Sequence, residues 1–226
     1  MKIIGNATVV TLGENHRVIE NGAVAFDEKK IHAIGTTDEI RQRYPKAKLK
    51  SVKGRVLMPG IVNTHMHLYS TFARGIALKD ASPTNFVEIL ERLWWRLDKA
   101  LTKEDLYLTA LIPLLDAVRN GVTTLIDHHA SPNCITGSLS VLRDVFRKCG
   151  LRGSLCYEIS DRDGFQKCDE GFTENANFIR GLKLERESDI HAMIGLHASF
   201  TLSDTSLERA AELMKALQTG VHIHVA

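Results

Sequence analysis

The chain has 226 residues, of which 44% are hydrophobic and 25% are charged. This composition predicts one large globular domain, or a medium domain with a smaller partner, and excludes wholesale disorder. The formal net charge of +2 gives no electrostatic footprint for nucleic acid or an anionic membrane, and no apolar run reaches the roughly 20 residues of a membrane span. The four cysteines form no CxxC pair, as expected of reduced thiols in a cytoplasmic protein.

Residues 1–56 contain short β-branched runs separated by polar turns, such as KIIGNATVVTL and GAVAFDEKKIHAIG. The pattern predicts strands joined by tight turns, with one helical turn at TTDEIRQRYP. We expect a small β-sheet domain, because so short a module is not a sandwich by itself.

From residue 57 the pattern changes to strands alternating with helices. The expected strands lie in five apolar runs, VLMPGIVNTHMHL, VTTLID, GSLCYEIS, HAMIGLHA and VHIHVA. Near-continuous apolar strands are typical of a sheet buried on both faces, and the alternation predicts parallel βαβ units in a barrel or a doubly wound sheet. A (β/α)8 barrel takes about 250 residues, so five strands correspond to an incomplete barrel.

Capping residues mark the expected helices. Asn85 begins TNFVEILERLWWRLDKAL, Thr102 begins LTKEDLYLTALIPLLDAVRNG, and Thr205 is the expected N-cap of SLERAAELMKALQTG. Trp94 and Trp95 lie on the first of these helices. Paired aromatic residues on an amphipathic helix belong to the core more often than to a pocket wall, and we expect the core here.

Two pairs of histidines are the strongest chemical signal. His65 and His67 lie two positions apart on the first strand of the alternating region, and His222 and His224 repeat the arrangement on the last. Residues two apart on a strand share a face, and neutral imidazole is a good ligand for Zn²⁺ or Fe²⁺. A single pair could be two polar residues near a turn, but four histidines from two strands are hard to explain by core packing. A catalytic metal takes three or four protein ligands, so one of the four is expected behind the ligands.

Further histidines lie at strand ends. His197 follows GL in GLHASF, and His128 and His129 follow LID in LIDHHASP. In a parallel barrel this end of the strands carries the active site. We therefore expect His197, His128 and His129 on the substrate side of the site, although each alone would be read as a structural histidine.

At MPGIVNTHMHL the sequence resembles the amidohydrolase superfamily, whose first barrel strand ends in HxH after a PG turn. The resemblance extends over essentially the whole chain and is strongest to the cytosine deaminase and chlorohydrolase-like branch. Within that branch HLYSTFARGI, DHHASP, CYEISDRDG and LHASFTLSD are similar to the SsnA aminohydrolases. The resemblance implies that residues 1–56 are half of a β-sandwich domain. Residues 57–226 would be the first part of a TIM-type barrel, truncated in strand 5.

The resemblance also implies roles for single residues. His65, His67 and His224 become metal ligands, and His197 a substrate-side residue. The expected fourth strand carries no Lys, which favours one metal over a dinuclear centre. The catalytic Glu of the H-x-H-x-x-E motif would lie three residues after His224, just past Ala226. No catalytic residue is therefore expected within the chain.

The function implied is metal-dependent hydrolysis of a C–N bond that is not a peptide. The simplest case is deamination of an N-heterocyclic small molecule by a metal-activated hydroxide. Cyclic-amide opening of the hydantoinase kind and hydrolytic dechlorination stay open, as does a catalytically incomplete, non-enzymatic fragment. The expected cofactor is one divalent ion, Zn²⁺ ahead of Fe²⁺. The expected partner is a small-molecule substrate, without nucleic acid or membrane, and a homo-oligomer stays open.

Overall fold

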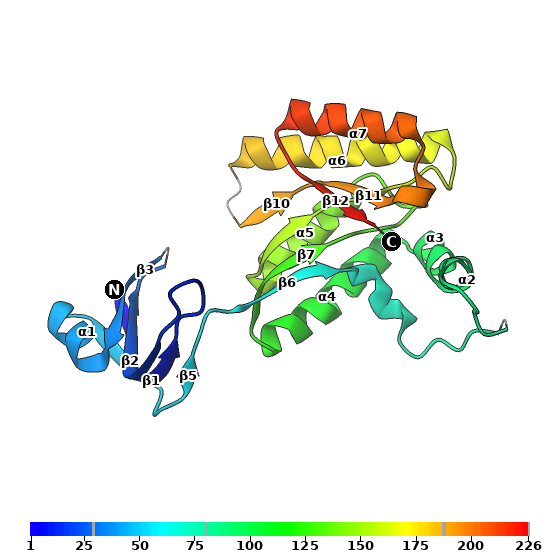
Figure 1. Ribbon diagram of the computed structural model, residues 1–226. Coiled ribbons are helices and arrows are strands. Elements are labelled where there is room, and N and C mark those ends of the chain that lie inside the picture. The colour runs from blue at the N-terminus through cyan, green and yellow to red at the C-terminus, as the bar shows by residue number, and fades with distance from the viewer. Residues whose placement is uncertain (29, 80, 187–188, 226) are drawn as a thin grey trace. The chain divides into compact units, whose positions relative to one another are not determined.

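The computed structural model describes residues 1–28, 30–79, 81–186 and 189–225. The chain divides into two compact units, Met1–Gly60 and Ile61–Ala226 (Figure 1). Each unit has its own sheet and its own buried core.

The first unit is a five-stranded sheet with one helix. The strand order is β3-β2-β1-β4, with β5 also paired to β1. The helix packs on one face of the sheet through a small core that contains Ile3 and Ile40, and it begins at a capping box of Thr36 and Glu39. The elements are β1 Lys2–Val10, β2 Val18–Phe26, β3 Ile31–Thr36, α1 Thr37–Arg43, β4 Lys48–Ser51 and β5 Val56–Leu57.

The second unit is built on parallel strands, in two hydrogen-bonded groups of order β10-β8-β7-β6 and β12-β11-β9. Because β8 and β9 follow one another along one strand position, and β10 and β11 along the next, the pieces fill five positions in chain order. A doubly wound sheet would reverse its order, so the α/β architecture is that of the TIM-type barrel, as predicted. The strands are β6 Ile61–Met66, β7 Val122–Asp127, β8 Arg152–Leu155, β9 Glu158–Ile159, β10 Ile190–Ala192, β11 Ile194–Ala198 and β12 Val221–His224.

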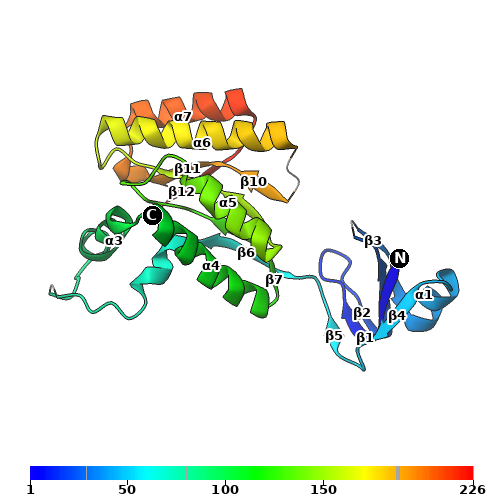
Figure 2. The same cartoon turned by 180° about the vertical axis from the view of Figure 1, so that it is seen from behind.

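Helices cover the outside of these strands. Figures 1 and 2 show α4, α5, α6 and α7 following one another around the sheet, as the outer ring of a barrel does. The helical elements are η1 Leu68–Ala73, α2 Phe86–Ile89, the π-helix η2 Leu90–Trp94, α3 Trp95–Ala100, α4 Lys103–Arg119, α5 Ser138–Cys149, α6 Phe165–Glu185, η3 Ser199–Thr201 and α7 Asp204–Leu217.

The helix starts agree with the sequence in two of three cases. Asn85 accepts a hydrogen bond from the Glu88 backbone N–H, and Thr102 forms a capping box with Asp105, as predicted. The third prediction was wrong, because the N-cap of α7 is Ser203 rather than Thr205. Ser203 accepts from the Ser206 backbone N–H and begins the helix earlier.

The core of the second unit lies between the strands and their helices. Its largest cluster contains Leu114, Leu125, Leu139 and Phe146, all fully buried. Gly195 permits an unusually close approach of two strands, since a Cβ there would lie 2.3 Å from the Tyr157 carbonyl oxygen. This approach pairs Gly195 with Glu158 in the sheet and brings the end of β11 beside β9.

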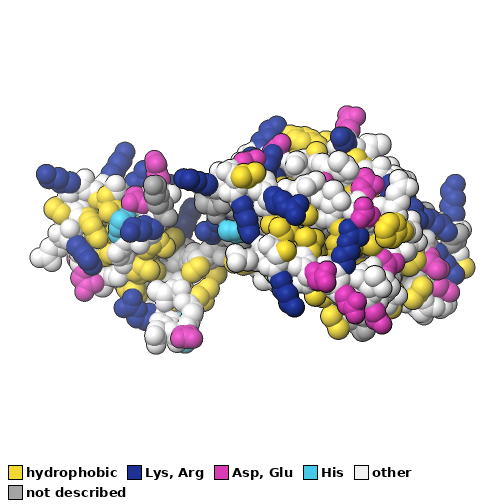
Figure 3. All heavy atoms as spheres, turned by 90° about the horizontal axis from the view of Figure 1, so that it is seen from above, with side chains coloured by type: hydrophobic (Ala, Val, Ile, Leu, Met, Phe, Trp, Pro, Cys, Tyr) yellow, Lys and Arg dark blue, Asp and Glu magenta, His cyan; other side chains and the backbone are white. Residues whose placement is uncertain are grey.

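Within the described residues, every helix is too short or too polar to cross a membrane. Figure 3 shows basic and acidic side chains interspersed on the face of the larger unit that it presents. Charged side chains of both signs are therefore mixed on this face.

Candidate metal centre

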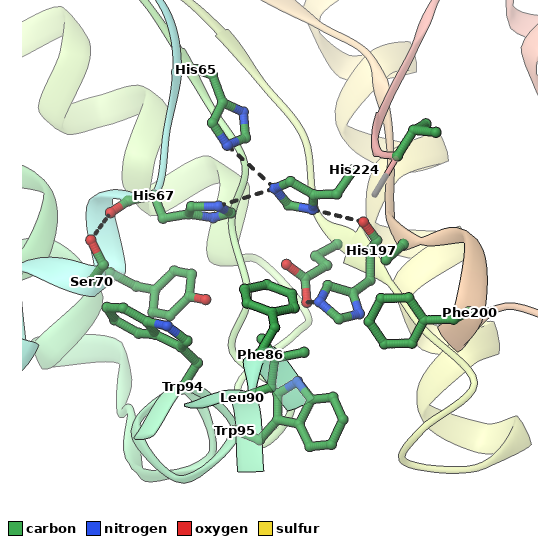
Figure 4. A pocket seen from close by; sticks show the side chains of 14 residues that line it. His65, His67, Ser70, Phe86, Leu90, Trp94, Trp95, His197, Phe200 and His224 are labelled. Atoms are coloured by element: carbon green, nitrogen blue, oxygen red, sulfur yellow. Dashed lines mark hydrogen bonds and ion pairs between the residues drawn. The ribbon is translucent and has the colours of Figure 1, made fainter. Parts of the chain in front are cut away.

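Three histidines meet at the carboxyl ends of the first and last strands of the second unit. His65 lies on β6, His67 directly follows that strand, and His224 ends β12. Each offers one ring nitrogen, and these atoms all lie within 4.8 Å of one another. Figure 4 shows the three rings pointing toward one another, although His224 is far from the other two in sequence.

The spacing of the nitrogens fits a tetrahedral metal. The Nε2 atom of His224 lies 3.3 Å from Nε2 of His65 and 3.2 Å from Nε2 of His67. Ligand nitrogens bound about 2.0–2.1 Å from a tetrahedral zinc ion lie about 3.3–3.4 Å apart. The observed distances are therefore close to the edges of such a tetrahedron.

Backbone carbonyls fix the tautomer of two of the rings. Nδ1 of His67 lies 2.7 Å from the carbonyl oxygen of His128, and Nδ1 of His224 lies 2.7 Å from that of His197. A carbonyl can only accept, so each Nδ1 must carry the proton and donate it. In the neutral ring Nε2 is then an unprotonated lone pair, which is the form that binds metal.

The tautomer of His65 is fixed by a chain of three hydrogen bonds. The thiol of Cys156 donates to the carbonyl of Asp127, with Sγ 3.5 Å from the oxygen, so its sulfur accepts from Nδ1–H of His222 at 3.8 Å. Nε2 of His222 is then bare and accepts from Nδ1–H of His65 at 2.9 Å. His65 therefore also turns an unprotonated Nε2 toward His224. His222 is the fourth histidine, the one expected behind the ligands.

The same rings are held neutral. Burial lowers the pKa of His67 to about 4, and neighbouring His128 acts in the same direction. Burial is also the main cause of the lowered pKa values of His65 and His224. Three lone pairs thus face one another without a proton between them. A divalent cation satisfies all three, so the donor set fits a metal ion.

A cavity of about 440 Å³ opens beside the three histidines. Aromatic side chains form part of its wall, and Trp94 and Trp95, which were expected in the core, both line it (Figure 4). Trp94 also packs against a buried cluster that contains Tyr69 and Leu106, so the core prediction holds in part for Trp94. The π-helix places Leu90 and Trp94 on this wall; such π segments are frequent at functional sites. The other aromatic residues that line the cavity are Tyr69, Phe86 and Phe200.

The cavity also contains a carboxylate that sequence reasoning missed. Glu158 lies on β9, lines the cavity and has a side chain that is 3% exposed. Burial alone would raise its pKa, but a hydrogen bond and charge from His128, with the charges of His197 and Arg162, outweigh burial and lower the pKa to about 2. An acidic residue inside an otherwise apolar strand was the available signal, because a buried charge requires partners.

The structure brings His197 to the cavity but not His128 or His129. His197 ends β11 and lines the cavity beside His224. His128 is fully buried, and its Nε2 donates to the Leu196 carbonyl at 3.0 Å. His129 is also fully buried, with Nε2 2.9 Å from the Ser131 hydroxyl. Both therefore lie behind the cavity wall, which differs from the substrate-side position expected for them.

A buried ion pair supports the aromatic wall. Arg162 bonds to Asp98, and the two side chains are 9% and 1% exposed. The Arg162 guanidinium also lies 5.1 Å from the ring centre of Trp95, within the range of a cation–π contact.

Comparison with known proteins gives one family over most of the chain. Residues 56–226 match the Amidohydrolase family, and residues 22–47 match the imidazolonepropionase-like composite domain of bacteria. The chain is 30% identical over 223 residues to a 5'-deoxyadenosine deaminase of Methanosarcina mazei, covering 99% of this chain and 48% of that protein. It is 29% identical to a 5-methylthioadenosine/S-adenosylhomocysteine deaminase of Moorella thermoacetica, covering 99% and 49%. The chain thus spans about half the length of these relatives.

Solved structures share the fold. An adenosine deaminase from Xanthomonas campestris with bound zinc superposes with a TM-score of 0.82 at 26% identity, covering 98% of this chain and 48% of that one. The atrazine chlorohydrolase TrzN from Arthrobacter aurescens, complexed with zinc, gives a TM-score of 0.75 at 21% identity, covering 99% and 52%.

Proposed function

Because the chain belongs to the amidohydrolase family, we propose that it is the metal-binding part of an aminohydrolase that removes an amino group from an N-heterocyclic small molecule. The proposal covers the metal as well, one Zn²⁺ ion held by His65, His67 and His224. The names of the relatives, which are deaminases of adenosine-type molecules, support the substrate class.

One observation carries the proposal. Three neutral imidazoles converge through unprotonated Nε2 atoms at the edge of a cavity with aromatic walls. A planar heterocycle stacks well on Trp and Phe rings, which hold it in one plane beside the three histidines.

Different side chains have different roles in the proposed reaction. A divalent ion at the three histidines supplies an activated water for hydrolysis at neutral pH. The hydrogen bonds made by each Nδ1 hold the ligand rings in place, and Trp94 and Trp95 exclude water from the substrate side. By family resemblance, proton transfer to the leaving nitrogen belongs to a Glu three residues after His224, a position outside these 226 residues.

Product analysis tests the reaction. The chain and the full product of the gene that encodes it are loaded with zinc and given adenine, guanine and cytosine. Ammonia release with the oxo product supports the proposal. Ring-opened ureido acids from cyclic amides, or chloride from chlorotriazines, without ammonia from any aminated ring, would replace it with one of the two alternative hydrolyses. The His67→Ala variant, which removes one of the three proposed ligands, is the matched control and is expected to lose both zinc and ammonia release.

We also propose a cytoplasmic location. All four cysteines are free thiols, which is typical of a reducing compartment.

A further inference from the structure

Glu158 and His197 form a pair of hydrogen-bond acceptors on one side of the cavity. We infer that this pair binds an N–H group of the substrate ring, so that the preferred heterocycle carries a ring N–H beside its amino-bearing carbon, as guanine does and adenine does not. The inference rests on the proposed function, because it names the substrate class of the same site.

One carboxylate oxygen of Glu158 contacts a buried histidine behind the cavity wall. Its Oε2 lies 3.2 Å from Nδ1 of buried His128. The other oxygen, Oε1, lies 3.8 Å from Nε2 of His197 and 4.0 Å from Arg162, beyond the usual 2.7–3.2 Å of a hydrogen bond. Because Glu158 lines the cavity, Oε1 is the oxygen left to accept a bond from a bound molecule.

The facing nitrogen of His197 is also an acceptor. The hydroxyl of Thr201 donates its only proton to the Ala198 carbonyl at 3.0 Å. It therefore accepts from Nδ1–H of His197 at 2.7 Å. In the neutral ring Nε2 then carries a lone pair.

The two acceptors define the complementary ligand. The carboxylate of Glu158, with Oε2 3.2 Å from Nδ1 of His128, accepts hydrogen bonds and does not donate them. An N–H of the ring satisfies the pair, whereas a ring nitrogen with a lone pair is repelled. Unpaired buried polar groups are the main source of discrimination between otherwise similar ligands.

The pair adjoins the metal ligands, which decides where the N–H must lie. One oxygen of Glu158, a nitrogen of His197 and a nitrogen of His224 all lie within 4.8 Å of one another. The reacting carbon must reach the metal centre, so the N–H that Glu158 and His197 read is on the neighbouring ring atom. Guanine has this arrangement, with N1–H beside the C2 amino group, whereas adenine has a bare N1 beside its C6 amino group.

Tryptophan fluorescence gives a direct readout of binding, since the only two tryptophans of the chain, Trp94 and Trp95, both line the cavity. The zinc-loaded protein is titrated with guanine, with 1-methylguanine, which lacks the N1 hydrogen, and with adenine. A hydrogen bond to a charged group is worth roughly tenfold or more in affinity. Guanine is therefore expected to bind at least about 10-fold more tightly than either of the others.

The Glu158→Gln variant is expected to lose this preference while keeping its zinc, and Glu212→Gln, a change at an exposed position of α7, is expected to keep it. Equal or tighter binding of adenine by the wild type, or an unchanged preference in Glu158→Gln, overturns the inference. The product analysis described under the proposed function separates the two proposals. If ammonia is released from adenine but not from guanine, the proposed function stands and this inference is overturned. If no aminated ring releases ammonia, the proposed function is contradicted, and the measured binding preference alone decides the inference.

Discussion

Nε2 of His67 lies 3.2 Å from Nε2 of His224, although the two residues are 157 positions apart in the sequence. Each ring donates its Nδ1 proton to a backbone carbonyl, of His128 and of His197 respectively. The lone pairs of the two Nε2 atoms therefore face each other. A cation bound between them is required to offset their repulsion. The backbone of the neighbouring strands thus determines the ligand geometry at the centre.

His222 is expected to hold the His65 ring for metal binding. In His222→Phe the Nδ1–H of His65 loses its acceptor, and changes to such supporting partners typically weaken metal affinity about 10–100-fold. Competition with a chromophoric chelator should show this loss with one zinc still bound per chain. Imidazole ¹⁵N spectra should show His65 changing from a single Nδ1–H tautomer to a mixture. An unchanged zinc affinity together with an unchanged His65 tautomer would mean that His222 does not hold the His65 ring. The control is His191→Phe, at an exposed position of β10.

The Asp98–Arg162 pair is expected to be strongly coupled. Arg162→Met leaves a carboxylate that is 1% exposed without its partner, which typically costs about 3–5 kcal/mol of unfolding free energy. In Asp98→Asn/Arg162→Met neither charge remains, so the double variant should be destabilised by less than the sum of the two single variants. Urea unfolding of the four proteins gives the coupling. Strict additivity would show that the two side chains do not interact.

Acid is expected to destabilise the metal-free protein. Burial lowers the pKa of His129 to about 3 and that of His222 to about 4, against about 6.5 in an unfolded chain. As the pH falls below 6.5 the unfolded chain takes up protons that the folded chain excludes. His129, which is fully buried, therefore removes about 1.4 kcal/mol of stability per pH unit between its unfolded and folded pKa values. The less buried His222 acts in the same direction.

The His129→Gln variant isolates one of these contributions. Its unfolding free energy should fall less steeply than that of the wild type between pH 6 and pH 4, by about 1.4 kcal/mol per pH unit. The matched comparison is His191→Gln, the same change at an exposed position of β10. Identical slopes in all three proteins would show that His129 is not held neutral by burial.

The shared face of each histidine pair could be predicted from sequence because the information is local. Residues two apart on a strand share a face, which places His65 with His67, and His222 with His224, without knowledge of the rest of the chain. Strand and helix alternation likewise predicts parallel βαβ units, whereas the barrel-type order of β6, β7 and the strands that follow was implied by the family resemblance.

The cavity wall could not be predicted in the same way. Trp94 and Trp95 have the same helical periodicity whether they face a core or an enclosed cavity, since both environments are apolar. Glu158 gave a weaker signal still, because its partners His128 and His197 come from other strands and meet it only in the folded chain. The N-cap of α7 was misplaced because Ser203 and Thr205 both offer a local capping pattern.

The zinc coordination shell tests the central claim, that His65, His67 and His224 hold one metal ion. X-ray absorption at the zinc edge should show three imidazole nitrogens at about 2.0–2.1 Å in the zinc-loaded protein. His224→Ala should lower the count to two and weaken zinc binding, whereas His191→Ala should change neither. A sulfur shell near 2.3 Å, or an unchanged nitrogen count in His224→Ala, would contradict the account.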